Sequence, residues 1–212
     1  MEKNACTGVI LAGGLNVRFN GKNKAFIEID GRKILDRILS VFRELFAETI
    51  IVTNHPTLYM DYDTPIVTDI YSVRSPLTGI HAGLTYSDSP FSFICACDTP
   101  FLKPELVHLI IQQIEPGYDV MIPQTADGLE ALCAAYSRQC LPVINQQLSG
   151  HQPDADPASR QLKRGLQIKQ FYNKVRVKKL PENLLREIDP RLVSFFNVNK
   201  PEDLEKAKKM LV

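Results

Sequence analysis

Short apolar runs alternate along the chain with segments whose apolar residues recur at helical spacing. The runs predict strands at 8–12, 49–53, 65–68, 91–97, 119–123 and 132–136. The helical spacing predicts helices at 34–45, 77–86, 102–114 and 140–148. Continuous apolar runs are typical of strands that are covered on both faces. Strands separated by helices therefore predict an α/β fold with a mostly parallel sheet and right-handed crossovers.

Three other regions carry weaker predictions. Residues 24–29 read as a short extended piece, and residues 150–159 are turn-rich and polar, which predicts a mobile loop before a basic helix at 162–171. Near the end, Asn199 is a candidate N-cap, and Glu202 three residues later would complete a capping box.

The first apolar run ends in a glycine pair, Gly13 and Gly14, and basic residues follow at Arg18 and Lys24. Glycines allow backbone amides to approach a ligand without a Cβ in the way, and a nearby cation suits phosphate. The spacing matches neither GxxxxGK[ST] nor GxGxxG, so the two best-known phosphate loops are excluded. The pattern predicts a nucleotide or phosphate site of another kind.

Polar side chains follow three of the predicted strands. Asp98 comes directly after the strongest apolar run, and Asn54 and Asp69 follow neighbouring strands. Open α/β sheets bind ligands at the carboxyl ends of their strands, and Mg2+ prefers hard oxygen ligands such as a carboxylate. Asp98 is therefore a candidate Mg2+ ligand. Asn and Asp residues after strands also commonly form turns, so a purely structural role for each of the three residues stays open.

Composition narrows the class of protein. The chain has 212 residues, 44% of them hydrophobic, and a formal net charge of +1, which suits one globular domain over residues 1–212 and gives no sign of a nucleic-acid or membrane partner. The first residues lead into the first strand without a basic leader, so we expect a cytoplasmic protein. The five cysteines form no CxxC pair and leave an odd thiol, which predicts reduced cysteines.

Residues 11–25, LAGGLNVRFNGKNKA, resemble the LAGGxSxRMGxDKA signature of the molybdenum cofactor guanylyltransferases. Phe19, Asn20 and Asn23 depart from that signature. The resemblance continues over nearly the whole chain in the segments 76–80 (PLTGI), 97–101 (CDTPF), 130–136 (EALCAAY) and 197–204 (NVNKPEDL).

The resemblance implies a Rossmann-like three-layer α/β/α sandwich of the nucleotide-diphospho-sugar transferase type. It implies transfer of GMP from GTP to molybdenum-molybdopterin with release of pyrophosphate, and Arg18, Lys24 and Asp98 as catalytic residues, with Mg2+ on Asp98. The implied nucleotide-binding residues are Leu11, Ala12, Gly13, Gly14, Lys24, Asn54, Asp69, Gly79 and Asp98. For the pterin side it implies Asn197 and Asn199.

The implied partners are GTP and molybdenum-molybdopterin, with molybdoenzyme apoproteins or cofactor-biosynthesis proteins as further candidates. Two rival enzymes are a molybdenum cofactor cytidylyltransferase and a sugar-phosphate nucleotidyltransferase; the cytidylyl relatives show LAAG where this chain has LAGG, which favours guanine. A rival of another class is a nucleotide-binding cofactor carrier with weak or no catalysis. Asn20 and Asn23 keep that alternative open.

Overall fold

The protein, seen here in a computed structural model, is described over residues 6–13, 23–149 and 168–211. Seven strands of the main sheet run in the order β10-β7-β9-β6-β1-β4-β5, and β8 pairs with β7. Their bounds are β1 (Cys6–Leu11), β4 (Thr49–Val52), β5 (Ile66–Val67), β6 (Phe91–Ala96), β7 (Val120–Thr125), β8 (Gly128–Leu129), β9 (Cys133–Ser137) and β10 (Val177–Pro181). A separate hairpin joins β2 (Glu28–Ile29) to β3 (Arg32–Lys33).

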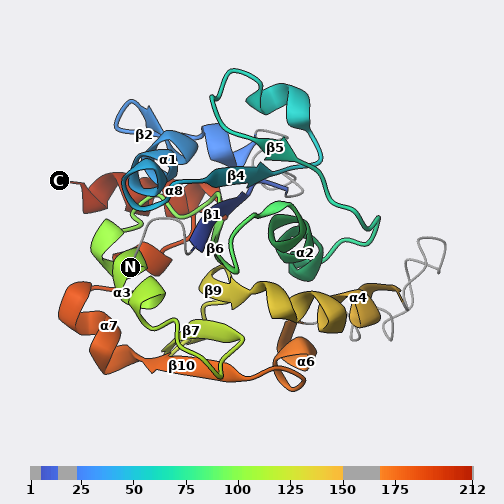
Figure 1. Ribbon diagram of the computed structural model, residues 1–212. Coiled ribbons are helices and arrows are strands. Elements are labelled where there is room, and N and C mark those ends of the chain that lie inside the picture. The colour runs from blue at the N-terminus through green and yellow to red at the C-terminus, as the bar shows by residue number, and fades with distance from the viewer. Residues whose placement is uncertain (1–5, 14–22, 150–167, 212) are drawn as a thin grey trace, which may run out of the picture.

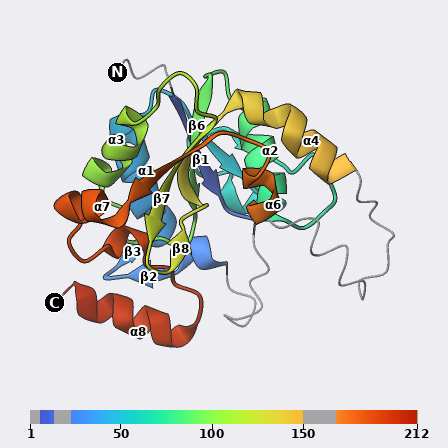
Figure 2. The ribbon, with the colours of Figure 1, turned by 90° about the horizontal axis from the view of Figure 1, so that it is seen from below.

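Helices cover both faces of the sheet. One face carries α1 (Ile34–Leu45), α3 (Pro104–Gln112) and α7 (Glu182–Ile188). Helix α8 (Pro201–Met210) packs against β2 of the hairpin. The other face carries α2 (Pro76–Tyr86), α4 (Leu141–Ser149) and α6 (Ile168–Tyr172), and Figure 2 shows the two groups on opposite sides of the strands. In the described part of the chain, four short 3-10 helices connect these elements: η3 (Lys24–Phe26), η4 (Pro56–Tyr59), η5 (Arg138–Cys140) and η6 (Val193–Phe195). The prediction of a three-layer α/β/α fold is confirmed.

Alternation along the central strands explains the two cores. Ile10 and Ile51 pack into the core on the α1 side, whereas their chain neighbours Val9 and Ile50 pack into the core on the α2 side. Successive side chains of a strand point to opposite faces, so a strand covered on both sides has to be apolar throughout. The continuous apolar runs of the sequence are the result.

Helix α2 approaches the central strand very closely because it carries two glycines. A Cβ at Gly83 would lie 2.6 Å from Cγ1 of Val9, and a Cβ at Gly79 would lie 3.2 Å from the methyl groups of Leu11. Both glycines therefore serve the packing of α2 on β1. Gly79 lies inside the helix, because α2 begins at Pro76, with the Ser75 hydroxyl accepting a hydrogen bond from the Leu77 amide at 3.2 Å.

The sheet is mixed, because β9 runs antiparallel to both β6 and β7. The chain passes from β7 to β9 through a short turn and the β7–β8 hairpin, so β9 returns antiparallel to β7. A parallel return would need a long crossover. Residues 24–29 also differ from the predicted extended piece, since the 3-10 helix η3 occupies its first half. The sequence did not reveal β10, whose only fully buried residue is Leu180.

Two predictions fall mainly outside the described residues, namely the 150–159 loop and most of the 162–171 helix. No helix in the described ranges is long and apolar enough to span a membrane. The single-domain organisation and the cytoplasmic location stay predictions.

Candidate active site

Three parallel strands in the middle of the sheet end at the same edge. Leu11 at the end of β1 pairs with Val52 of β4 and with Ala96 of β6, and the three strands lie side by side in Figure 1. The residues that follow them are therefore neighbours: Ala12 and Gly13 after β1, Asn54 after β4, and Asp98 after β6. In open α/β sheets this edge is where ligands bind.

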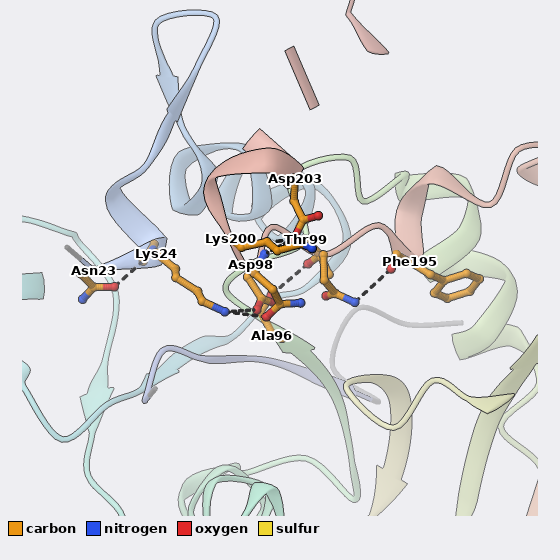
Figure 3. Close-up of polar contacts among 11 residues, drawn as sticks. Asn23, Lys24, Ala96, Asp98, Thr99, Phe195, Lys200 and Asp203 are labelled. Carbon is orange, nitrogen blue, oxygen red and sulfur yellow. Dashed lines mark hydrogen bonds and ion pairs between the residues drawn. The ribbon is translucent and has the colours of Figure 1, made fainter. Parts of the chain in front are cut away.

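The ammonium group of Lys24 lies at this edge between two oxygens. It donates to Oδ2 of Asp98 at 3.1 Å and to Oδ1 of Asn199 at 2.7 Å. The side chains of Lys24 and Asp98 are each only 18% exposed. Figure 3 shows Lys24 extending from its 3-10 helix toward Asp98. Three segments that are distant in sequence thus meet at one positive charge.

The segment that carries Lys24 is fastened to the glycine turn through Asn23 and Tyr59. The Asn23 carboxamide oxygen accepts from the Ala25 amide at 3.0 Å and so caps η3, while its nitrogen donates to the Tyr59 hydroxyl at 2.7 Å. That hydroxyl in turn donates to the carbonyl of Ala12 at 3.3 Å. Burial raises the pKa of Tyr59 to about 12, so the hydroxyl stays protonated and can donate. Asn23, which departs from the signature, therefore has a structural role, while Asp98 and Asn199 orient Lys24.

Asn199 is not the N-cap that its sequence position predicted. Lys200 is the N-cap of α8, and the Asp203 carboxylate accepts from the backbone amides of Asn199 at 3.0 Å and Lys200 at 3.1 Å. The side chain of Asn199 contacts Lys24 instead. The sequence predicted Glu202 as the acidic partner of the cap, but the structure has Asp203 in that role. By accepting from the backbone amide of Asn199, Asp203 positions Asn199. The Val198 amide also donates to the Asp98 carbonyl at 2.9 Å, which joins this segment to the loop after β6.

Asn197 does not join this cluster. It is exposed, and its carboxamide donates to the carbonyl of Phe195 at 3.0 Å. Its predicted role on the pterin side stays a prediction.

Asn54 and Asp69 form a reciprocal pair at the neighbouring strand ends. The Asn54 carboxamide donates to Oδ2 of Asp69 at 2.7 Å, and the Asp69 amide donates back to Oδ1 of Asn54 at 3.3 Å. Burial raises the pKa of Asp69, although the hydrogen bond from Asn54 and the nearby His81 oppose that shift. The pairing places a carboxylate and an amide next to each other, which suits recognition of a polar edge of a nucleotide.

His81 lies behind this pair on α2. Its ring packs edge-on against Tyr71 with the ring centres 5.0 Å apart, and only 4% of the residue is exposed. Burial lowers its pKa, although a hydrogen bond with Asn145 and the negative charge of Asp69 act in the opposite direction. The role of His81 was not predictable from the sequence, because its burial depends on the packing of α2 against α4.

The glycine turn is described only as far as Gly13, so Gly14 and Arg18 lie outside the described residues. Gly13 is exposed, and a Cβ there would meet no atom of the described residues within 4 Å. Leu11, by contrast, is half-buried over Gly79. Among the described residues, none therefore covers the turn at Gly13.

The oxygens around Lys24 are of the type that a divalent cation prefers. Among residues 6–13, 23–149 and 168–211, no group of three His, Cys, Asp or Glu side chains forms a ready-made metal cage. Asp98 and Asn199 supply hard oxygen atoms at one point. Mg2+ is often bound by one or two carboxylates together with substrate phosphates, so these residues fit such a metal.

Residues 8–165 match the family model described as the MobA-like NTP transferase domain. The chain belongs to this family. It is accordingly a nucleotidyltransferase, and the predicted enzyme class is confirmed.

The chain is similar to several named members of the family. It is 44% identical, over 96% of its length and 95% of the relative, to the molybdenum cofactor guanylyltransferase of Desulfosudis oleivorans. It is 36% identical, over 96% of its length and 92% of the relative, to a probable molybdenum cofactor guanylyltransferase of Pelotomaculum thermopropionicum. The crystal structure of molybdopterin-guanine dinucleotide biosynthesis protein A from Archaeoglobus fulgidus superposes with a TM-score of 0.79 at 26% identity, covering 97% of this chain and 98% of that one.

A matched pair of asparagine variants tests the arrangement around Lys24. Asn199→Ala removes a hydrogen bond to a charged group, which is worth about 1.5–3 kcal/mol, so we expect kcat/KM for nucleotidyl transfer to fall ~10- to 100-fold. Asn183→Ala, which removes an exposed carboxamide on α7, should leave kcat/KM within about twofold. Steady-state pyrophosphate release measures both. Equal losses in the two variants would show that the contact with Lys24 does not matter.

The lowered pKa of His81 predicts how stability depends on pH. The folded-state pKa of His81 lies below its ordinary value of 6.5. The stability that the neutral ring contributes is therefore fully present above pH 6.5 and is lost as the pH falls through the folded pKa. His81→Gln should remove this loss. Urea unfolding measures the free energy of unfolding between pH 7.5 and 5.5. This free energy should fall more steeply with falling pH in the wild type than in His81→Gln, by at most about 1.4 kcal/mol per pH unit, the limit for one proton. Parallel profiles would contradict the assignment.

Proposed function

We propose that the protein transfers GMP from GTP to molybdopterin carrying molybdenum and releases pyrophosphate. The observation that carries the substrate choice is the 44% identity, over 96% of the chain, with a relative named molybdenum cofactor guanylyltransferase. The Lys24 cluster at the carboxyl ends of the central strands supports the chemistry, because it offers a positive charge and oxygen ligands at one point.

The reaction needs positioning and charge neutralisation more than a nucleophilic side chain. The terminal phosphate of molybdopterin attacks the α-phosphorus of GTP in line, the bond from the α-phosphorus to the bridging oxygen breaks, and pyrophosphate leaves with the electron pair. Because two anions have to approach each other, cationic groups at the phosphates lower the barrier.

Lys24 would hold the triphosphate of GTP and stabilise the negative charge that develops on pyrophosphate. Its present partners, Asp98 and Asn199, pre-orient the ammonium group and share its charge until substrate phosphates replace them. Arg18, which lies outside the described residues, is proposed for the same phosphates.

Asp98 would hold Mg2+, with Asn199 close enough to offer a second oxygen. When bound, the metal supplies neutralisation of phosphate charge and a template for in-line attack. The loop that carries Asp98 is anchored by the bond from the Val198 amide to its carbonyl, which limits the movement of this ligand.

The Asn54–Asp69 pair and the turn at Gly13 are proposed for the guanosine moiety. Guanine presents two adjacent donors on its Watson–Crick edge, and a carboxylate beside an amide is a suitable partner. Cytosine lacks this pair of donors, so a site built on such hydrogen bonds would reject it. On the pterin side, Asn199 is proposed through its place beside Lys24, and Asn197 as a nearby exposed amide.

Nucleotide choice is the sharpest test of this function. Purified protein with Mg2+ and molybdopterin should release pyrophosphate from GTP with a kcat/KM at least about 100-fold above those for CTP and ATP, because lost hydrogen bonds discriminate strongly. Lys24→Ala should slow the reaction with GTP, whereas Lys206→Ala, an exposed lysine of α8, serves as the matched control.

The remaining outcomes separate the alternatives. Preference for CTP would redirect the assignment to a cytidylyltransferase while leaving the site at Lys24 intact. Tight GTP binding without release of pyrophosphate would support a cofactor carrier. Pyrophosphate release that needs a sugar phosphate in place of molybdopterin would support a sugar-nucleotide enzyme.

A further inference from the structure

A hollow of about 550 Å³ lies on the α1 side of the molecule. Its lining comes from β3, α1, the 100–103 segment that follows Asp98, the 189–193 segment after α7, and the end of α8. None of Lys24, Asp98 and Asn199 lines it. The hollow is therefore distinct from the candidate active site, and α1, α3, α7 and α8 gather around this side in Figure 2.

The hollow combines an apolar surface with positive charge. Val41, Phe101 and Met210 represent its apolar part. Its charged lining consists of four cations and one acid: Arg32, Arg37, Lys103, Arg191 and Asp189. An excess of three formal positive charges in one concave place favours an anion.

The one acid is already engaged and does not neutralise the arginines. Asp189 is fully buried, its Oδ1 lies 3.0 Å from the Lys103 ammonium, and its Oδ2 accepts from the Ser194 amide at 2.8 Å. Burial alone would raise the pKa of Asp189, but the bonds from Ser194 and Lys103 hold it below its ordinary value, so the carboxylate stays charged. Arg32, Arg37 and Arg191 form no ion pair with any described carboxylate. Asp36, the nearest other acid on α1, hydrogen-bonds with the Tyr62 hydroxyl.

Arg37 provides an independent sign of a missing partner. One terminal nitrogen of its guanidinium donates to the carbonyl of Ile29, which fixes the group in place. Its Nε is buried and has no hydrogen-bond partner within the described part of the chain. A buried donor without an acceptor is costly, so the described chain does not use the full hydrogen-bonding capacity of the Arg37 guanidinium.

We propose that this hollow binds a small organic anion that combines an aromatic or other apolar body with a phosphate or sulfonate group. The apolar lining takes the body, and Arg37 with Arg191 takes the anionic group through charge-assisted hydrogen bonds, for which guanidinium groups are well shaped. The site does not depend on the proposed function, because it shares no residue with the Lys24 cluster.

The dye 1-anilinonaphthalene-8-sulfonate is a suitable probe, because it joins an aromatic body to one sulfonate. Fluorescence titration of the full chain should show saturable binding that is unchanged in Lys24→Ala, because Lys24 does not line the hollow. The double variant Arg37→Gln/Arg191→Gln should weaken the affinity at least about tenfold, as expected for lost charge-assisted hydrogen bonds. The double variant Lys174→Gln/Lys179→Gln, at two exposed lysines outside the hollow, controls for the loss of two positive charges.

A second variant tests the location without removing a charge. Ser40, which lines the hollow and is exposed on α1, can be replaced by Trp to fill the space. Ser40→Trp should abolish the saturable fluorescence while leaving the arginines in place, and far-ultraviolet circular dichroism confirms that the variants fold. Inorganic pyrophosphate should compete with the dye only weakly, because it lacks the apolar body. Dye binding within twofold of the wild type in both variants, or loss of dye binding in Lys24→Ala, would overturn the proposal.

Discussion

The candidate site depends on how the positive charge of Lys24 is held. Asp98 and Asn199 accept from its ammonium, and they lie 74 and 175 residues away from it in sequence. A largely buried charge is costly unless oxygens surround it, so this one group requires the strand end after β6, the 3-10 helix after the glycine turn and the segment before α8 to meet. Desolvation offsets much of the attraction in such a pair, so the contact matters more for positioning than for stability.

The fold was predictable wherever burial on both faces forced a continuous apolar run. Residues 91–97 predicted a strand, and β6 spans Phe91–Ala96. The edge strand β10 was missed because Leu180 is its only fully buried residue, which leaves no run to detect. Periodicity also says nothing about strand direction, so the antiparallel course of β9 followed only from its pairing with β6 and β7.

Parts of the site were predictable because strand ends gather at one edge. Lys24 and Asp98 were candidates from the sequence, and the structure brings them together. Tyr59 and Asp203 were not, because each acts through a backbone or side-chain partner that only the tertiary structure supplies. Asn199 shows most clearly what the sequence could not predict. Asparagine is a favourable N-cap residue, but here its side-chain oxygen accepts from the Lys24 ammonium, and Lys200 is the N-cap of α8.

The most direct test of this account is a double-mutant cycle between Lys24→Gln and Asp98→Asn, with the Kd for GTP measured by isothermal titration calorimetry. If the two side chains act as one unit, the loss in the double variant will be smaller than the sum of the single losses, by a coupling energy of about 0.5–3 kcal/mol. Effects that add within about 0.3 kcal/mol would show that the two groups act independently, and would contradict the central claim.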